Sequence, residues 1–285
     1  MKHNPYYNLG MHTPIVLLTD FGDRDPFVGI MKGVIATISP SAPLIDLNHN
    51  IPPGDIQQTA VTLWQSVDYF PDGSVFLTVV DPGVGTERHA MILDSGPHRF
   101  IGPDNGVFSF LFEEEVQAWQ LSNPDYALPD AGTTFHGRDL FAPAAAHAWR
   151  GIPGPKFGKA IPDPVRLPLP RLETVSAGML RGEILHADHF GNLLTSLGQF
   201  RPLEQGTLHL TPWLGDAPDL EIDPAVTRLH LPDGIKLPWA STFATIPNGE
   251  CAALIGSSGL IEIAANGQSA AEMLGLGRGD IVTLS

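Results

Sequence analysis

The hydrophobic pattern of the first half of the chain predicts strands that alternate with helices. Short apolar runs bounded by polar residues, glycine or proline are typical of buried strands, and apolar residues at helical spacing are typical of amphipathic helices. Asp25 with Pro26, and Asp55, stand where helix caps are expected. We expect strands at 15–18, 43–47 and 75–80 and helices at 27–38 and 56–67. This order predicts parallel strands joined by right-handed crossovers.

A hairpin, a further strand and a further helix are predicted next. The hairpin pairs 89–93 with 99–102 around Ser95-Gly96-Pro97, the turn Gly-Pro-Asp-Asn-Gly follows at 102–106, the strand covers 116–121 and the helix covers 139–149. Ligands of parallel sheets bind beyond the carboxyl ends of the strands. Asp20, Asp46 and Asp81 are all expected at such ends. Asp20 could bind the two hydroxyls of a ribose, or it could simply cap the next turn. The turn at 102–106 needs no role beyond reversing the chain.

The pattern changes after a proline-rich stretch at 152–172, which is typical of a linker or a surface strap. Short apolar runs, many of them separated by glycine turns, follow and predict a β module, either a barrel or a sandwich. The expected strands cover 179–187, 193–197, 207–210, 226–231, 252–256, 260–265 and 281–284. We therefore expect an α/β domain at 11–172, with a mostly parallel central sheet flanked by helices. A smaller all-β, barrel-like domain is expected at 173–285.

Composition and charge fit a folded protein with a cationic partner. The 285 residues are 43% hydrophobic and only 16% charged, which supports a packed core and argues against disorder. Asp and Glu outnumber Lys and Arg by 31 to 16, which gives a formal net charge of −15. A surface of this sign repels nucleic acid and anionic membranes, so we expect neither as a partner. Solubility alone would also explain the acidic surface.

The cysteine count and the lack of a long apolar stretch bear on the location. The single cysteine, Cys251, excludes an intramolecular disulfide framework and a cysteine-based zinc site, and its apolar neighbours predict a core position. No apolar stretch approaches the roughly 18 residues of a membrane span. The first ten residues carry no apolar signal core and are expected to be a lead-in before a possible second start at Met11. A cytoplasmic location is therefore expected.

The densest chemical signal is the segment 79–88, which reads Val-Val-Asp-Pro-Gly-Val-Gly-Thr-Glu-Arg. It places Asp81, two glycines and Arg88 in one loop, and a second cluster, Thr-Phe-His-Gly-Arg-Asp at 134–139, adds His136. A carboxylate, a guanidinium and an imidazole around one cavity can orient and deprotonate a water molecule. The loop matches neither a dinucleotide fingerprint nor a phosphate-binding loop, and no metal-ligand spacing accompanies it. A structural ion pair and a structural histidine are the alternative interpretation.

Two further polar clusters lie in the second half of the chain. In the segment 186–192, Asp188 could hold an ammonium group, Phe190 could stack on a base and Asn192 could bind an amide or amine edge. Its histidines also allow a metal site, although a hairpin tip explains them better. The glycine-flanked turn that contains Ser257 could hold a carboxylate through its amides and hydroxyls, or it could be only a turn.

In this order, the clusters resemble the S-adenosyl-L-methionine (SAM) hydroxide adenosyltransferases, also called SAM hydrolases (adenosine-forming), which are relatives of the fluorinase and chlorinase enzymes. The matching segments are 19–22, 81–88, 103–106, 134–139, 188–192, 256–257 and 260–264. The resemblance extends from 19 to 279, nearly the whole chain. Each segment is a weak signal alone, but the ordered set is a strong one.

The resemblance implies a fold, an assembly and a reaction. The family has an amino-terminal α/β domain and a carboxy-terminal β domain. It forms homotrimers in which the ligand lies at the subunit interface, between the first domain of one subunit and the second domain of its neighbour. Water attacks C5′ of the ribose of SAM and displaces methionine, so the products are adenosine and L-methionine. SAM is the substrate, and the resemblance implies no additional cofactor and no metal.

The resemblance also implies roles for individual residues. Asp81, Arg88 and His136 match the group that handles the water. The residues that match substrate-binding positions are Asp20 for the ribose hydroxyls, Phe190 and Asn192 for the adenine, and Asp188 and Ser257 for the amino and carboxylate ends of methionine. An aspartate with a pKa near 3.9 is a weak base, and it is weaker still beside an arginine. We therefore expect Asp81 to orient the water and His136 to accept its proton.

Departures from the family pattern leave alternatives open. The halogenases place a tyrosine at the position of Asp81, whereas Gly137 matches the small residue of the chlorinase. The fluorinase has an arginine after the serine that matches Ser257, and this chain has Ser258 there, so backbone amides would have to hold the carboxylate. The alternative functions are a SAM-dependent chlorinase-type halogenase, a SAM- or adenosine-binding protein without turnover, and a metal-dependent hydrolase.

Overall fold

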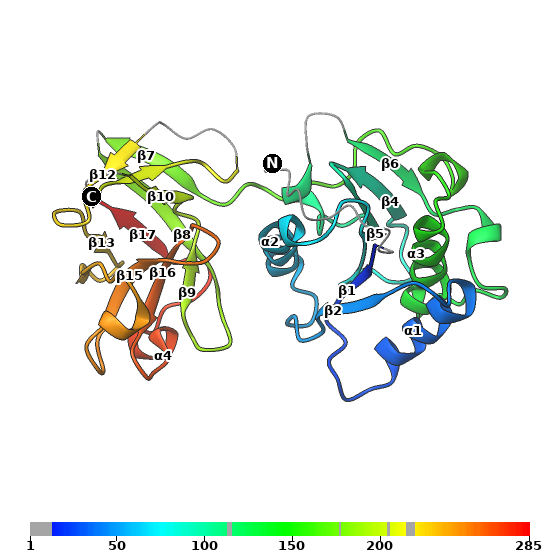
Figure 1. Cartoon of the computed structure of the whole chain (residues 1–285), viewed down its shortest axis with the longest axis horizontal. Coiled ribbons are helices and arrows are strands. Elements are labelled where there is room, and N and C mark those ends of the chain that lie inside the picture. The colour runs from blue at the N-terminus through cyan, green and yellow to red at the C-terminus, as the bar shows by residue number, and fades with distance from the viewer. Residues whose placement is uncertain (1–12, 113–115, 177, 204–205, 215–219) are drawn as a thin grey trace. The chain divides into compact units, whose positions relative to one another are not determined.

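The computed structural model describes residues 13–112, 116–176, 178–203, 206–214 and 220–285 (Figure 1). The expected lead-in before Met11 lies outside these residues. No helix within these ranges is both long and apolar enough to span a membrane. The chain forms two compact units that divide between Leu167 and Pro168, and each unit is described in turn.

The first unit has one six-stranded sheet with helices on both faces. Its strands are β1 (Ile15–Thr19), β2 (Leu44–Asn48), β3 (Val75–Val79), β4 (Ala90–Ser95), β5 (His98–Pro103) and β6 (Gln117–Gln120). Its helices are α1 (Phe27–Ile38), α2 (Ile56–Ser66) and α3 (Ala142–Trp149), with the short helical turns η1 (Val67–Tyr69), η2 (Ser109–Leu111), η3 (Pro124–Tyr126), η4 (Gly137–Phe141) and η5 (Gly154–Lys156). The strand order is β2-β1-β3-β5-β4-β6. Pairing is parallel from β2 to β5 and antiparallel from β5 to β6, so the predicted α/β fold with a mostly parallel sheet is confirmed.

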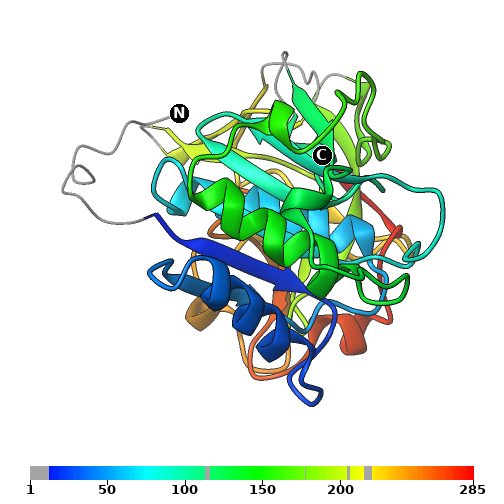
Figure 2. The same ribbon diagram turned by 90° about the vertical axis from the view of Figure 1, so that its right-hand side faces the viewer.

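The alternation of side chains along β1 produces a core on each face of the sheet. Ile15 and Leu17 pack with residues of α1 and α3, whereas Val16 and Leu18 pack with residues of α2. All four are buried. Figure 2 shows α1 and α3 together on one face of the sheet, in agreement with the contacts between these helices. Strands covered on both faces are continuously apolar, which is why the short apolar runs could be recognised in the sequence.

The two predicted helix starts have different outcomes. Asp55 caps α2, because its side chain accepts a hydrogen bond from the Gln58 N–H at 2.9 Å. Asp25 does not cap α1. The residue before that helix is Pro26, and no side chain bonds to the free amides of its first turn. The fixed φ of proline is compatible with the helix, so the start is defined without a cap.

Asp46 does not lie at a strand end as expected. It pairs with Leu17 in the middle of β2, the edge strand of the sheet. Its carboxylate accepts a hydrogen bond from Lys32 at 2.6 Å and contacts Nε2 of His49 at 2.9 Å. The predicted strand ended at Leu47, but main-chain pairing with β1 continues it to Asn48, so two strand residues follow Asp46.

The second unit consists of antiparallel strands and one short helix. Its strands are β7 (Leu172–Ser176), β8 (Met179–Ala187), β9 (Leu193–Thr195), β10 (Phe200–Pro202), β11 (Leu208–Leu210), β12 (Leu220–Ile222), β13 (Leu229–His230), β14 (Lys236–Leu237), β15 (Cys251–Ile255), β16 (Ile261–Ala265) and β17 (Ile281–Leu284). Its helix is α4 (Ala270–Leu274), and η7 (Phe243–Thr245) is a further helical turn. The pattern did not predict β7, β10, β12, β14 or α4.

The larger sheet of the second unit nearly closes on itself. Its order is β14-β13-β17-β8-β9-β16-β15, with β7 beside β8, and a smaller sheet has the order β10-β11-β12. Immediately after β14, Ala240 donates to the Ala253 carbonyl at 2.8 Å, and Ala253 donates to the Pro238 carbonyl at 2.9 Å. The two ends of the strand order therefore meet, as expected of a barrel-like domain.

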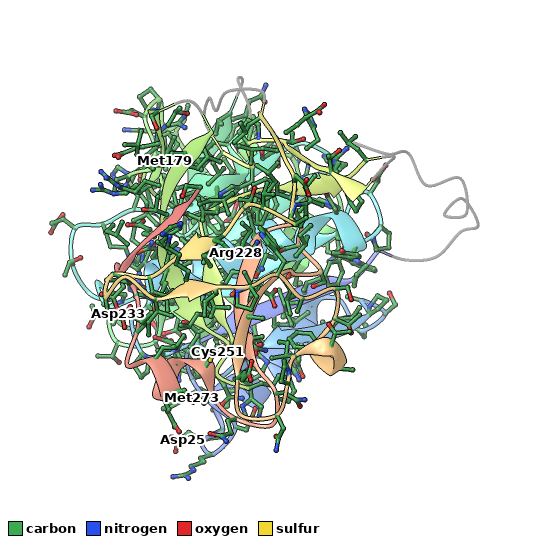
Figure 3. The ribbon with its side chains drawn as sticks, turned by 90° about the vertical axis from the view of Figure 1, so that its left-hand side faces the viewer. Asp25, Met179, Arg228, Asp233, Cys251 and Met273 are labelled. Carbon is green, nitrogen blue, oxygen red and sulfur yellow. The ribbon has the colours of Figure 1, made fainter. Side chains whose placement is uncertain are left out.

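Cys251 begins β15 (Figure 3). It is partly buried, and it packs against the core of the second unit. Burial raises the pKa of its thiol above the ordinary value, which disfavours the reactive thiolate. This environment agrees with the expected packing role.

The aromatic cluster around Phe76 gives a test of the core on the α2 side. The Phe76 ring is fully buried, with the rings of Phe70, His98 and Phe100 at 5.2, 5.4 and 5.1 Å between centroids. Phe76→Ala should lower the free energy of unfolding by about 3–5 kcal/mol in urea titrations followed by circular dichroism. The control Tyr69→Ala removes a ring that is 75% exposed and should change it by less than about 0.5 kcal/mol. Equal losses would show that the Phe76 cluster does not stabilise the core.

Candidate active site

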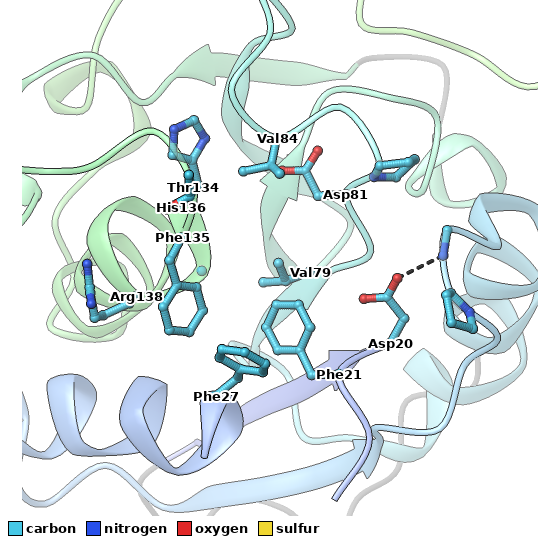
Figure 4. Close-up of a pocket in the computed structure, with 14 residues that line it drawn as sticks. Asp20, Phe21, Phe27, Val79, Asp81, Val84, Thr134, Phe135, His136 and Arg138 are labelled. Atoms are coloured by element: carbon cyan, nitrogen blue, oxygen red, sulfur yellow. Dashed lines mark hydrogen bonds between the residues drawn. The ribbon is translucent and has the colours of Figure 1, made fainter. Parts of the chain in front are cut away.

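A cavity of about 770 Å³ opens at the carboxyl ends of β1 and β3 (Figure 4). Asp20 and Phe21 follow β1, Asp81 follows β3 after one residue, and all three line the cavity. The loop before α2 contributes Gly54, and the segment 134–138 closes another side. This is the edge at which parallel sheets bind their ligands.

Asp81, Arg88 and His136 converge beside this cavity. Arg88 binds the carboxylate of Asp81 with two hydrogen bonds: Nε donates to Oδ1 at 2.9 Å, and Nη2 donates to Oδ2. Nη2 also donates to Nδ1 of His136 at 2.8 Å. The side chains of Asp81 and Arg88 are only 5% and 10% exposed, so water screens the ion pair weakly. The three residues form one hydrogen-bonded unit, which we call the Arg88 unit.

The bond from Arg88 determines the tautomer of His136. A guanidinium only donates hydrogen bonds, so Nδ1 must accept, and the neutral ring carries its hydrogen on Nε2. Burial is the largest cause that lowers the pKa of His136 below its ordinary value, and the charge of Arg88 adds to it. The negative charges of Asp81 and Asp139 oppose this shift without cancelling it. His136 is therefore neutral at pH 7 in the free protein.

Glycines shape the loop that carries Asp81 and Arg88. Gly85 has a φ of +80°, which side chains rarely adopt. A Cβ at Gly83 would lie 3.3 Å from Cγ of Arg88 and 3.8 Å from Oδ1 of Asp81, so a side chain there would press on the ion pair. The lack of a side chain at Gly83 thus leaves room for the Arg88 unit.

His136 immediately precedes the wide helical turn η4, in which the N–H of Ala142 bonds to the carbonyl of Gly137. Such π-type turns are frequent at functional sites. A Cβ at Gly137 would lie 3.0 Å from the Phe135 ring and 3.1 Å from Sδ of Met31. Packing against these two side chains therefore explains why a glycine follows His136.

Asp20 directs its carboxylate into the cavity. Oδ2 accepts a hydrogen bond from the Gly54 N–H at 2.8 Å, and the other oxygen points into the open space (Figure 4). Burial raises the pKa of Asp20 above its ordinary value, and the charge of Asp81 contributes in the same direction. The bond from Gly54 opposes this shift.

A chain of hydrogen bonds supports the strand end that carries Asp20. The hydroxyl of Thr19 contacts Nδ1 of His49 at 2.9 Å, and Nε2 of His49 contacts Asp46 at 2.9 Å. Thr19 is fully buried, and its hydroxyl also accepts from the Phe21 N–H at 3.3 Å. Asp46 thus supports the cavity from the edge of the sheet, although it does not line it as the strand-end argument expected.

Three phenylalanines that the sequence did not select form one wall of the cavity. The rings of Phe21, Phe27 and Phe135 lie 5.3–5.9 Å apart between centroids (Figure 4). Phe27 occupies a core position in the helical pattern of α1, yet it is 41% exposed at the start of that helix. A pattern of apolar positions does not distinguish a residue that lines a cavity from a residue that packs in the core.

In the second unit, Asp188 and Asn192 close the turn between β8 and β9. Oδ1 of Asp188 accepts from the main-chain N–H groups of Phe190 and Asn192, both at 2.8 Å, and Oδ2 accepts from Nδ2 of Asn192 at 2.8 Å. Phe190 is 75% exposed, whereas Asn192 is buried. His186 and His189 lie in the same segment, and no group of three or more His, Cys, Asp or Glu in the described ranges could hold a metal ion.

Ser257 lies in the turn between β15 and β16 and is exposed. The neighbouring hydroxyl of Ser258 is buried and makes no hydrogen bond with the described residues. Glu262 packs so closely on Gly256 that a Cβ there would lie 1.8 Å from its Oε1. Burial, and then the charge of Asp188, raise the pKa of Glu262, so Glu262 lies near both turns. No sequence pattern pointed to Glu262 beyond its place in a matching segment.

Comparison with known proteins gives a consistent family. The models of the SAM hydroxide adenosyltransferase N-terminal and C-terminal domains match residues 15–158 and 182–283. An (R)-S-adenosyl-L-methionine hydrolase of Thermus thermophilus is 37% identical over 282 residues, which cover 95% of this chain and 99% of the relative. A fluorinase of an Actinoplanes species is 30% identical over 211 residues, which cover 64% and 71%. The crystal structure of an uncharacterized conserved protein from Thermotoga maritima superimposes with a TM-score of 0.80 at 32% identity, and the match covers 95% of this chain and 99% of that chain.

The environment of His136 predicts its titration. In nuclear magnetic resonance titrations of ring-labelled histidines, the pKa of His136 should lie below the ordinary value of 6.5. Arg88→Gln should raise it, because the variant removes a positive charge and leaves Asp81 and Asp139 in place. His147, whose pKa burial lowers without a contribution from Arg88, is the internal control and should not change. A pKa of His136 at or above 6.5 in the unsubstituted protein would contradict the described environment.

Proposed function

The chain belongs to the SAM hydroxide adenosyltransferase family, and on this premise we propose that it hydrolyses S-adenosyl-L-methionine to adenosine and L-methionine. A water oxygen bonds to C5′ of the ribose, the carbon–sulfur bond breaks, and its electron pair converts the sulfonium into the neutral thioether of methionine. One proton is released. A neutral leaving group needs no acid, so the site has to supply only an oriented water and a proton acceptor. The Arg88 unit beside the cavity is the observation that carries this proposal.

The lining of the cavity supports a cationic substrate. The faces of Phe21, Phe27 and Phe135 are electron-rich, and such rings attract a ligand cation. The carboxylates of Asp20 and Asp81 add negative charge on the other sides. The sulfonium of SAM is a compact cation that can use both features.

The substrate-binding roles follow the resemblance and the free hydrogen-bonding groups. Asp20 would hold the ribose hydroxyls with the oxygen that Gly54 leaves free, and the exposed ring of Phe190 would stack on the adenine, as the resemblance implies. Asn192 keeps Oδ1 for the amino edge of the adenine, because Nδ2 is bonded to Asp188. Asp188 and Ser257 would hold the amino and carboxylate ends of methionine, without an additional cofactor or metal. The homotrimer with interface sites and the cytoplasmic location stay predictions.

The tautomer of His136 bears on the route of the proton. With Nδ1 bonded to Arg88 and hydrogen on Nε2, the ring can take a proton only after Arg88 releases Nδ1. We therefore propose that Asp81 receives the proton late in the attack, when the oxygen joined to C5′ has become strongly acidic. Each carboxylate oxygen retains a lone pair beside its bond to Arg88. In this scheme His136 holds Arg88, and through it Asp81, in place.

Two features bear on the halogenase alternative: the reason for the small residue at Gly137, and the groups that a chloride nucleophile would face. The packing of Gly137 against Phe135 and Met31 explains its small size without a chloride site. A chloride in the water position would face the carboxylate of Asp81, and the charge of Arg88 is already engaged by that carboxylate. The arrangement favours water over a halide.

Product analysis in labelled water tests the proposed reaction. Purified protein mixed with SAM in oxygen-18 water should give adenosine labelled at the 5′ hydroxyl and unlabelled methionine, detected by liquid chromatography and mass spectrometry. Added chloride should give no 5′-chloro-5′-deoxyadenosine, whose formation would establish a halogenase. Tight SAM binding with no methionine released over hours would establish a binding protein, and loss of activity with a chelator would indicate a metal-dependent hydrolase.

The pH dependence of two variants tests the proton route. Asp81→Asn should lower kcat by about 10²–10⁴-fold, which is the usual contribution of a positioned proton acceptor. His136→Asn should lower kcat less and keep the fall in rate at acidic pH. If His136 were the acceptor, as expected from its ordinary pKa, that fall would follow the lowered pKa of His136 in the unsubstituted enzyme and would disappear in His136→Asn.

A further inference from the structure

The turn at 103–106, Pro-Asp-Asn-Gly, is hydrogen-bonded to both ends of the loop that carries Asp81 and Arg88. We propose that Asn105 in this turn is a positioning residue for the reaction. This inference rests on the proposed function. The turn follows β5, the neighbour of β3 in the sheet, so it lies next to the strand end from which the loop departs.

Asn105 holds the first end of the loop. Its Nδ2 donates to the carbonyl of Val80, the residue directly before Asp81, at 3.0 Å. Its Oδ1 accepts from the N–H of Val107 at 3.3 Å. A main-chain carbonyl can only accept and a main-chain N–H can only donate, so both ends of the amide are assigned. One side chain thus connects the end of β3 to the turn after β5.

Asp104 holds the second end of the loop and keeps the turn in place. Its N–H donates to the carbonyl of His89, the residue directly after Arg88, at 2.9 Å. Its Oδ1 accepts from the Val165 N–H at 2.8 Å, and Asp104 is only 7% exposed. The turn is therefore a buried, fixed point for both loop ends.

Apart from the bonds of Arg88 to Asp81 and His136, few contacts hold the loop between these two ends. Five of its residues, Pro82 and Val84 to Glu87, are exposed. Its internal main-chain hydrogen bonds are short-range turns, from the Val84 N–H to the Asp81 carbonyl at 3.2 Å and from the Thr86 N–H to the Gly83 carbonyl at 3.1 Å. The carboxylate of Asp81 is thus positioned by its bonds to Arg88 and by the carbonyl that Asn105 holds one residue earlier. A misplacement of about 1 Å at a reacting group can cost 10²-fold in rate.

Asn123 offers a matched control in the same unit. Its Oδ1 accepts from the Asp125 N–H at 3.0 Å, and its Nδ2 donates to the carbonyl of Lys156 at 2.9 Å. Both asparagines therefore combine a local turn with a bond to a distant carbonyl. Asn123 does not line the cavity and makes no contact with the Arg88 unit within the described residues.

The test compares Asn105→Asp with Asn123→Asp. Each aspartate keeps the acceptor that closes the local turn but loses the donor to the distant carbonyl. Asn105→Asp should lower kcat about 10–10²-fold, with the KM for SAM within about twofold of the unsubstituted enzyme. Asn123→Asp should leave both constants unchanged. Asn105→Ala, which adds no charge, should lower kcat in the same direction.

A second readout does not depend on activity. If Asn105 positions the Arg88 unit, nitrogen chemical shifts at pH 8 should show a smaller fraction of the Nε2–H tautomer of His136 in Asn105→Asp and Asn105→Ala, and no change in Asn123→Asp. Equal kcat and equal tautomer fractions in the Asn105→Asp and Asn123→Asp proteins would overturn the positioning role. Absence of methionine release by the unsubstituted protein would instead overturn the proposed function, and the tautomer would still decide the role of Asn105.

Discussion

The guanidinium of Arg88 is the constraint on which the arrangement of the site depends. It donates to both oxygens of Asp81 and to Nδ1 of His136, so two residues from distant segments must place their acceptors around one planar group. Removing one partner from a shielded ion pair leaves an uncompensated charge, which typically costs several kcal/mol. The loop, the following strand and the segment before η4 therefore have to keep all three groups together.

The sheet supplies the fixed points that this constraint requires. β1, β3 and β5 are parallel neighbours, so the residues after them emerge side by side at one edge. Asp20 follows β1, where buried Thr19 is bonded to His49. Asp81 follows β3, where the turn after β5 holds the carbonyl of Val80 through Asn105. Asp20 and Asp81 lie on short loops. In each loop, the residue directly before the carboxylate is hydrogen-bonded to a residue that follows a neighbouring strand.

The sequence was sufficient to predict the strands and helices whose buried residues form a continuous apolar run or a regular apolar stripe. β1, β3 and the helices around them were predictable because their apolar positions are regular, whereas β14 and α4, with two and five residues, are too short to establish a period. The ordered motifs in the sequence predicted that Asp81, Arg88 and His136 belong to one site. For Asn105 the sequence predicts only a turn, because the pattern Pro-Asp-Asn-Gly is the same whether or not the asparagine amide reaches a distant carbonyl. The tautomer of His136 likewise depends on a contact that no sequence pattern specifies.

Asp81 and His136 act as one unit through Arg88. A double-mutant cycle on kcat/KM for SAM with Asp81→Asn, His136→Asn and the combined variant measures this coupling directly. Residues that act as a unit are strongly non-additive, so the combined variant should be within about threefold of Asp81→Asn alone. If the two single losses multiply in the combined variant, the residues contribute independently and the account of the site is wrong.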